Sequence, residues 1–311
     1  MKNKTISIIL ILSIIIISFL LLNKFNSKKT SDLAVKDNNN IVATETNDSL
    51  KSNEQDLSKT NTKSEEVGDK KITKQKPIEQ TVIGKSVSGK DIVAYRFGTG
   101  PDKLLFIGGV HGGYSVGTVD LSYKTIEYLT ENLTNIPKNL TVTVIPALNQ
   151  DGLKKTTGIE GRFNANNVDL NRNFDCNWSA TSKWRDKTVS GGSKEFSEPE
   201  AAALRDFVLS YQPKAAVVWF AAEGKVYPAS CGEDYGEETL NLTKIFAEAS
   251  GYKTGDTFNA YDITGDMVDW MTDEGITAIS VLLSEHNKPE WNKNKAGIEA
   301  VINYYSNKSA N

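Results

Sequence analysis

The chain has 311 residues, with 36 lysines and arginines against 39 aspartates and glutamates, so its formal net charge is −3. A slightly acidic chain without a basic stripe does not fit a nucleic-acid-binding protein, and we expect no nucleic-acid partner. The composition is uneven, because an apolar start and a long polar stretch precede the part with the mixed pattern of a folded domain. We therefore expect one folded domain rather than two.

Residues 1–25 contain an apolar run, Ile6 to Leu22, which only three serines interrupt and which Lys2 and Lys4 precede. Such a run either spans a membrane or forms the apolar part of a signal peptide. We predict an uncleaved transmembrane signal anchor, because no small-residue cleavage pattern follows the run and no cysteine there could carry a lipid. A cleaved signal peptide is the alternative.

Residues 26–76 consist mostly of Asn, Lys, Ser, Thr, Asp and Glu and contain almost no aromatic side chains. Such a segment buries too little apolar surface to offset the entropy lost on ordering, so we predict a disordered polar linker. Lysines on both sides of the apolar run leave its orientation weakly specified. We expect the N-terminus inside and residues 77–311 outside, which makes the protein a single-pass membrane protein with an extracytoplasmic folded domain.

From residue 77 the chain alternates between short β-branched runs and longer amphipathic segments, as strands and helices layered on one sheet do. The predicted strands are Ile92–Phe97, Lys103–Ile107, Leu140–Pro146, Ala215–Phe220 and Thr277–Leu283. The predicted helices are Gly117–Leu129, a helix from the capping box Ser197-Glu198-Pro199-Glu200 to about Ser210, Glu237–Ser250, Gly265–Glu274 and Trp291–Tyr305. These elements predict an α/β domain.

Two features stand outside this alternation. Asn149–Gly192 is a polar, asparagine-rich stretch much longer than ordinary connections, so we expect it to carry function. Cys176 and Cys231 both lie in the folded part, where an oxidising location would permit one disulfide. The alternative is two separate buried cysteines.

Three segments resemble the zinc-carboxypeptidase family, which includes carboxypeptidase A and bacterial murein-peptide enzymes. The first is Gly108–Tyr114, of sequence GGVHGGY, where the family has Gly-Gly-x-His-Gly-x-Glu. The His and Glu of that motif are two of the family's three zinc ligands. The resemblance implies that His111 is a retained ligand and that Tyr114 replaces the Glu.

The second segment is Gly161–Phe174, of sequence GRFNANNVDLNRNF, and it is the most specific of the three. The resemblance implies that Asn171 and Arg172 bind the terminal carboxylate of a peptide and that Arg162 polarises the scissile carbonyl. A planar guanidinium suits the first role, because it can donate two parallel hydrogen bonds to one carboxylate.

The third segment is Tyr261–Trp270 with the strand that follows it. It resembles the family's region where a mobile tyrosine closes over the substrate, which implies that role for Tyr261. In the strand, Leu282 stands where the family has its general-base Glu. The family's remaining zinc-ligand His corresponds to Ala221. The resemblance also implies a mixed central β-sheet flanked by helices on both faces.

A catalytic zinc site needs three protein ligands and an open position for water, and His111 alone does not supply them. We expect no cofactor, with zinc as the one candidate. The predicted protein is a membrane-anchored, zinc-carboxypeptidase-like protein that binds peptide C-termini, with catalysis lost or strongly reduced. Cell-wall stem peptides are candidate partners. Its recognition residues would bind the ground state without stabilising a transition state.

Two other functions stay open. The first is an active zinc metallocarboxypeptidase with a non-standard metal site, in which Glu223, Glu285 or His286 replaces a lost group. The second is a tethered structural or interaction module without a ligand. In that module, Arg162 and Arg172 would pair with Asp169 or Asp175 and brace the long polar stretch.

The preference for the last side chain of a peptide also stays open. Val268 in the third segment suggests an apolar side chain, whereas Asp266 suggests an amine. The sequence does not separate the two.

Overall fold

The computed structural model describes residues 79–308 except 156, 233, 257 and 259. The predicted anchor, residues 1–25, and the predicted linker, residues 26–76, lie outside the described residues. Within the described part, every helix is too short or too polar to span a bilayer.

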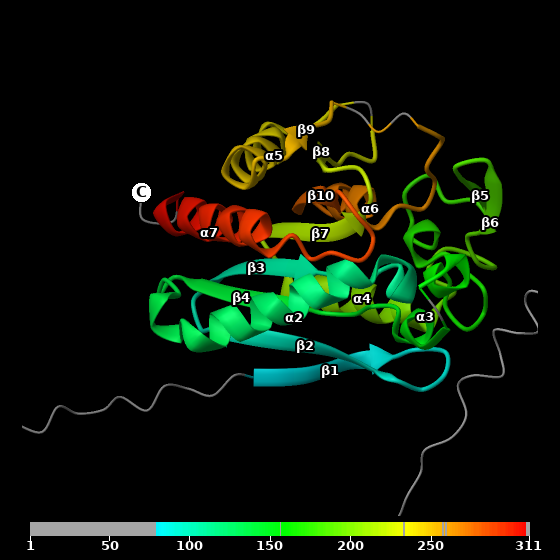
Figure 1. Ribbon diagram of the computed structural model, residues 1–311, viewed down its shortest axis with the longest axis horizontal. Helices are drawn as coiled ribbons and strands as arrows, with labels where there is room; N and C mark the ends of the chain where they lie inside the picture. The colour runs from blue at the N-terminus through cyan, green and yellow to red at the C-terminus, as the bar shows by residue number, and fades with distance from the viewer. Residues whose placement is uncertain (1–78, 156, 233, 257, 259, 309–311) are drawn as a thin grey trace, which may run out of the picture. The chain divides into compact units, whose positions relative to one another are not determined.

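A mixed sheet of eight strands forms the centre of the described domain, in the order β1-β2-β4-β3-β7-β10-β8-β9 (Figure 1). Its strands are β1 Glu79–Lys85, β2 Asp91–Gly98, β3 Asp102–Ile107, β4 Leu140–Ile145, β7 Ala215–Ala221, β8 Lys225–Pro228, β9 Lys253–Thr254 and β10 Thr277–Leu283. The central strands β4, β3, β7 and β10 run parallel, and β2 and β8 pair antiparallel with them. The carboxyl ends of the four parallel strands therefore share one edge of the sheet, which is where α/β proteins place their ligand sites.

Helices cover both faces of this sheet (Figure 1). One face carries α2 Val116–Glu131, α5 Glu237–Ser250 and α7 Trp291–Lys308, and the other carries α4 Pro199–Tyr211 and α6 Met267–Asp273. Strands covered on both faces need apolar residues throughout, and β4 is indeed buried along its whole length. The predicted α/β domain with a mixed sheet and helices on both faces is confirmed.

The long stretch Asn149–Gly192 folds into several short elements. These are α3 Gln150–Lys155, the three-ten turns Ile159–Arg162 and Leu170–Arg172, and the two-stranded hairpin β5 Thr181–Trp184 and β6 Lys187–Ser190. Two further three-ten turns, Gly112–Ser115 and Leu133–Asn135, flank α2. A region without strong periodicity thus builds compact turns around the sheet edge.

The starts of two helices differ from the sequence prediction. The N-cap of α4 is Glu198 rather than Ser197, because the Glu200 carboxylate accepts hydrogen bonds from Val87 N–H and Asn164 Nδ2 and is drawn away from the predicted capping box. Helix α6 begins two residues later than predicted, because the Asp266 carboxylate caps it by accepting from two backbone N–H groups.

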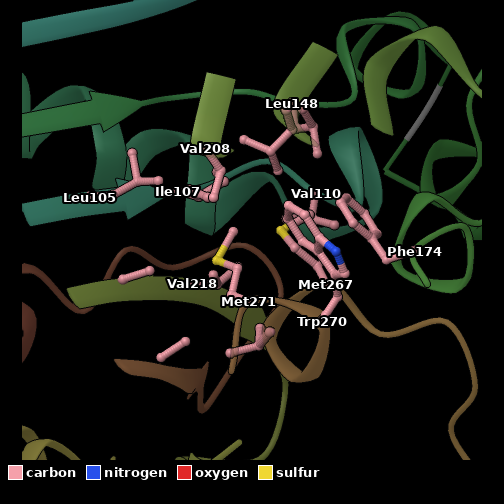
Figure 2. Close-up of a cluster of buried hydrophobic side chains, with 14 of the residues drawn as sticks. Leu105, Ile107, Val110, Leu148, Phe174, Val208, Val218, Met267, Trp270 and Met271 are labelled. Atoms are coloured by element: carbon pink, nitrogen blue, oxygen red, sulfur yellow. The ribbon is translucent and has the colours of Figure 1, made fainter. Parts of the chain in front are cut away.

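A buried hydrophobic cluster lies beneath the carboxyl edge of the parallel strands (Figure 2). Val110, Phe174, Met267 and Trp270 converge there, and each is less than 3 % exposed. Each of these four residues is close in sequence to a predicted site residue, and together they come from three separate segments. Because cores pack to high density, the cluster fixes those segments relative to one another.

Candidate functional site

A cavity of about 520 Å³ lies at the carboxyl edge of the parallel strands. Strand β7 contributes Ala221, and β10 contributes Ser280 and Leu282, which point to the same face because they are two residues apart. The cavity also brings together all five site residues predicted from the sequence, namely His111, Arg162, Asn171, Arg172 and Tyr261. Their positions are therefore shared, whereas their individual roles stay predictions.

His111 follows β3 and is 5 % exposed. Its Nε2 lies 3.4 Å from Asp169 Oδ1, and neither ring nitrogen completes a hydrogen bond with a described residue. Burial, and then the nearby Arg162 guanidinium, lower the pKa of His111 to about 4. The imidazole is thus neutral at pH 7.

Arg162 and Asp169 form a buried ion pair. Arg162 Nε donates to Asp169 Oδ2 at 2.7 Å, and the two side chains are 3 % and 0 % exposed. Burial alone would raise the pKa of Asp169, but the Arg162 guanidinium, His111 and Arg172 hold it well below its usual range. The guanidinium carbon of Arg162 also lies 4.9 Å from the centroid of the Trp184 ring. Arg162 therefore braces the long polar stretch while it lines the cavity.

Arg172 is 1 % exposed, and its described hydrogen-bond partners are backbone oxygens. Nη1 donates to Asn171 O at 2.6 Å, and Nε and Nη2 donate to Lys183 O at 3.3 and 3.2 Å. A guanidinium has five N–H groups, so one on Nη1 and one on Nη2 stay unused. No described carboxylate forms an ion pair with Arg172, which leaves this cation able to bind an external carboxylate.

Asn171 and Tyr261 flank Arg172. Asn171 Nδ2 donates to Asp266 Oδ2 at 2.5 Å, and its Oδ1 accepts from Met267 N–H, so this side chain joins the polar stretch to the start of α6. The Tyr261 ring lies 5.9 Å from the Arg172 guanidinium carbon. Asn171 thus has a positioning part beyond the carboxylate binding that the resemblance implied.

The three replaced positions divide into two groups. Ala221 and Leu282 line the cavity together with His111. Tyr114 instead lies in a second cavity of about 500 Å³, where its ring contacts Trp184 and His286 with centroids 5.5 and 4.3 Å apart. Tyr114 is therefore not among the residues that line the cavity with His111.

The donor set around His111 does not fit zinc. In the described part of the chain, the acidic side chain in contact with His111 is Asp169, which is already paired with Arg162, and the side chains of Ala221 and Leu282 offer no atoms that could bind a metal. Among the described residues, no group of three or more His, Cys, Asp and Glu side chains is arranged to hold a metal ion.

The substitutes considered from the sequence also lie elsewhere. Glu223 Oε1 accepts hydrogen bonds from Lys225 and Tyr227, each at 2.7 Å. Glu285 pairs with Lys288, and both Glu285 and His286 line the second cavity beside Tyr114. None of the three lines the cavity that contains His111.

Cys176 and Cys231 form a disulfide with a Cα–Cα distance of 5.6 Å. Cys231 lines the cavity, so the bridge joins the loop after Arg172 to the loop after β8 at the cavity rim. The sequence left this pairing open, and the structure resolves it.

Several residues that line the cavity were not predicted as site residues from the sequence, among them Trp184 and Asp269. Trp184 could have been suspected, because a bulky aromatic residue within a polar stretch needs a buried surface. Asp269 lies three residues after Asp266, and that spacing places two residues on one face of a helix.

Comparison with known proteins shows where the chain belongs. Human carboxypeptidase D is 32 % identical over 110 residues, which are 30 % of this chain and 8 % of that protein. Murein peptide amidase A of Escherichia coli K12 is 31 % identical over 173 residues, which are 50 % of this chain and 64 % of that protein. This chain thus spans only part of the length of these relatives.

Solved structures share the fold. Bovine thrombin-activatable fibrinolysis inhibitor, in complex with tick carboxypeptidase inhibitor, superposes with a TM-score of 0.62 at 20 % identity, covering 75 % of this chain and 90 % of that one. Murein-tripeptide amidase of Escherichia coli O157 gives 0.54 at 20 % identity, covering 74 % and 92 %. The zinc carboxypeptidase family model matches residues 69–299. The chain therefore belongs to the zinc carboxypeptidase family.

Proposed function

We propose that this protein binds the C-termini of peptides, with the catalysis of its family lost or strongly reduced. One observation carries the proposal. Arg172 is buried, has no carboxylate partner among the described residues, and lines the same cavity as Ala221 and Leu282. A cation with unused donors supports carboxylate binding, and apolar side chains at positions 221 and 282 offer no group there that could bind a metal or take a proton from water.

The retained groups favour binding without turnover. A general base contributes on the order of a hundred- to ten-thousand-fold to the rate, and an aliphatic side chain at position 282 cannot take a proton. Interactions with the carboxylate of a bound peptide are equally strong before and during hydrolysis, so they bind the ligand without lowering the barrier.

We propose further that the folded domain lies outside a membrane, anchored by residues 6–22 and tethered by the polar linker. The apolar run and the composition of residues 26–76 support this arrangement. Cell-wall stem peptides are the candidate ligands, and the similarity to murein peptide amidase A supports them. The measurement for the location is fractionation of cells that express the full chain or a chain starting at residue 76. Only the full chain should sediment with membranes.

The test of function uses the full-length chain purified in detergent. Zinc content is measured by elemental analysis, and calorimetry with a chelator present compares a peptide that has a free C-terminus with its C-terminal amide. We expect less than stoichiometric zinc and at least tenfold tighter binding of the free carboxylate. Stoichiometric zinc together with chelator-sensitive hydrolysis would instead favour an active enzyme.

Substitution of Arg172 by lysine tests the residue that carries the proposal. Lysine keeps the charge but lacks the planar fork, so affinity for the free carboxylate should fall about tenfold or more. Arg185→Lys is the matched control, because Arg185 is exposed near the same site and should change affinity less than twofold. If the unsubstituted protein binds no peptide and Arg172→Lys only lowers the stability of the fold, the protein is a structural module.

A further inference from the structure

The disulfide between Cys176 and Cys231 belongs to the cavity rim as well as to the fold. Cys176 lies in the loop after Arg172, and Cys231 lies in the loop after β8. The residues Ser230, Cys231 and Gly232 all line the cavity, and we call them the rim segment. The bridge therefore holds one part of the cavity wall in place.

The Cys176 end of the bridge is firmly fixed without the sulfur–sulfur bond. Cys176 is 3 % exposed and packs in the hydrophobic cluster. Its backbone is also paired, because Gly265 N–H donates to Cys176 O at 2.7 Å and Phe174 N–H donates to Gly265 O at 3.1 Å. This end should stay in place when the bridge is broken.

The Cys231 end is different, because the chain leaves the core just before it. Ala229 is 4 % exposed and belongs to the hydrophobic cluster, whereas Gly232, three residues later, is exposed. Two polar contacts of the rim segment reach other parts of the described domain. Ser230 N–H donates to Asp269 Oδ1 at 3.1 Å, and Asn177 Nδ2 lies 3.5 Å from Cys231 O, at the limit of a hydrogen bond.

The remaining described hydrogen bonds of the rim segment are local. Gly232 N–H donates to Ser230 Oγ at 3.1 Å, and Ser230 Oγ donates to Asp234 O at 2.8 Å. Such bonds shape the loop but do not attach it to the body of the domain. Without the bridge, the segment would depend mainly on the bond between Ser230 and Asp269.

The two sulfurs also differ in access. A thiolate must reach one sulfur of a disulfide in order to break it. The Cys176 side chain is buried, whereas Cys231 is partly exposed and lines a cavity of about 520 Å³. Reduction should therefore begin at Cys231 Sγ, from the cavity side.

A dithiol supplies both steps of this reduction. Its first thiolate attacks Cys231 Sγ, which forms a mixed disulfide and releases Cys176 as a thiolate. Its second thiolate then attacks the reductant's own sulfur in the mixed disulfide, which releases Cys231. The reductant leaves as a disulfide, so two electrons and two protons pass from it to the two cysteines.

We propose that the Cys176–Cys231 disulfide is a thiol-exchange site that controls the cavity. A dithiol reductant that enters the cavity breaks the bridge at Cys231, the rim segment loses its order, and the cavity loses part of its wall. The oxidised chain is the form that holds a ligand. That last part rests on the proposed function, whereas the place of exchange and the local loss of order do not.

The first experiment follows the bridge and the fold together. The full-length chain in detergent is treated with dithiothreitol without denaturant, and its free thiols are counted by alkylation and mass spectrometry. Amide hydrogen exchange is compared with that of the untreated chain. We expect complete reduction, with exchange in 230–232 at least tenfold faster, while β3 and β7 keep their protection.

Two results of this experiment would overturn the proposal. A bridge that resists dithiothreitol until the chain is denatured would show that the reductant does not reach the sulfurs from the cavity. A loss of protection in β3 and β7 along with the rim segment would show that the bridge supports the whole fold rather than one part of the cavity wall.

The second experiment measures what the bridge does to the cavity. Calorimetry with a chelator present compares the oxidised and reduced chains as a peptide with a free C-terminus is added. We expect at least tenfold tighter binding by the oxidised chain, with recovery after reoxidation. Because binding and oxidation are linked, saturating peptide should lower the midpoint potential of the bridge by about 30 mV for a tenfold difference in affinity.

The variant Cys176→Ser/Cys231→Ser is the matched control. It should have the hydrogen exchange and the affinity of the reduced chain, and dithiothreitol should change neither. Affinities of the oxidised and reduced wild type within twofold of each other would overturn the control of the cavity and leave peptide binding standing. If neither form binds the peptide while reduction still frees the rim segment, the proposed function fails and the exchange site stands.

Discussion

The Arg162–Asp169 pair shows how a single buried interaction can support a whole loop. Both groups are almost fully buried, and His111 and Trp184 complete their surroundings. Removing one member of such a pair leaves an uncompensated charge in the interior. The pair therefore matters to stability whether or not a ligand binds.

Asp169→Asn should lower the free energy of unfolding by about 3–5 kcal/mol, because Arg162 would stay buried without its counter-charge. Urea denaturation of the purified protein measures this. The double variant Asp169→Leu with Arg162→Met should recover a large part of the loss, since it removes both charges. Equal stability of Asp169→Asn and the wild type would contradict a structural role for the pair.

Asp169 also predicts sensitivity to acid. Its pKa is held below the unfolded value of about 3.9, so its contribution to stability is present above that pH and is lost as the pH falls below it.

For Asp269 we expect the opposite dependence of stability on pH. With a pKa of about 8 in the folded state, its contribution is present below pH ~4 and is lost as the pH rises to about 8.

The Asp269 prediction is measured by comparing the free energy of unfolding of the wild type and Asp269→Asn from pH 5 to 9. The charged or polar groups around Asp269 are Asp266, Arg172 and the Ser230 N–H. We expect the wild type to lose stability relative to the variant as the pH rises, because only the wild type has a carboxyl that burial keeps protonated. Parallel curves for the two proteins would be inconsistent with the raised pKa.

At the scale of elements, the helices and strands that could be predicted from the sequence are those with a clear hydrophobic period and sufficient length. Glu237–Ser250 and Thr277–Leu283 were predicted with their observed bounds, because their apolar residues recur with the helix and strand periods. Strands β1, β5, β6, β8 and β9 were missed. They are edge strands or short strands, which bury few residues and so give weak patterns.

The candidate site divides in the same way. The motif residues His111, Arg162 and Arg172 could be predicted to share a site, because the resemblance covers their local sequence. The pairing of Arg162 with Asp169 was among those considered from the sequence, and the structure confirms it. The hydrogen bonds from Arg172 to Lys183 O could not be predicted, since they form only through the folding of the long stretch. Asp266 could not be separated from Val268 from the sequence, because the environments of both depend on where α6 begins.

Trp184 packs the hairpin β5–β6 against the rest of the domain, alongside the hydrogen bonds from Arg172 to Lys183 O. Two-stranded hairpins are marginally stable alone, and Trp184 at the end of β5 packs against Arg162, Tyr114 and Arg185. Trp184→Ala should therefore raise amide hydrogen exchange in 181–190 at least tenfold while β3 and β7 keep their protection. A uniform rise across the domain would show instead that the tryptophan stabilises the global fold.

At the scale of the whole molecule, the disulfide closes a loop of 55 residues between the polar stretch and the segment after β8. A loop of this length corresponds to about 4 kcal/mol in the chain-entropy model. The Cys176→Ser/Cys231→Ser variant should melt about 10 °C lower than the wild type. Calorimetric scans with and without a reductant provide the control, since the reductant should affect only the wild type. If the double variant melts within 2 °C of the wild type, the disulfide does not stabilise the fold appreciably.

Leu282 at the cavity wall bears on how long a peptide stays bound as well as on chemistry. An enzyme empties its site by turning the ligand into products, whereas a site without a base must release the ligand intact. With an association rate of about 10⁶ M⁻¹s⁻¹, a Kd of about 10 µM gives a residence of about 0.1 s, and a Kd of about 1 nM gives roughly 1,000 s. Under the proposed function, exchange of the bound peptide within about a second requires a Kd in the micromolar range.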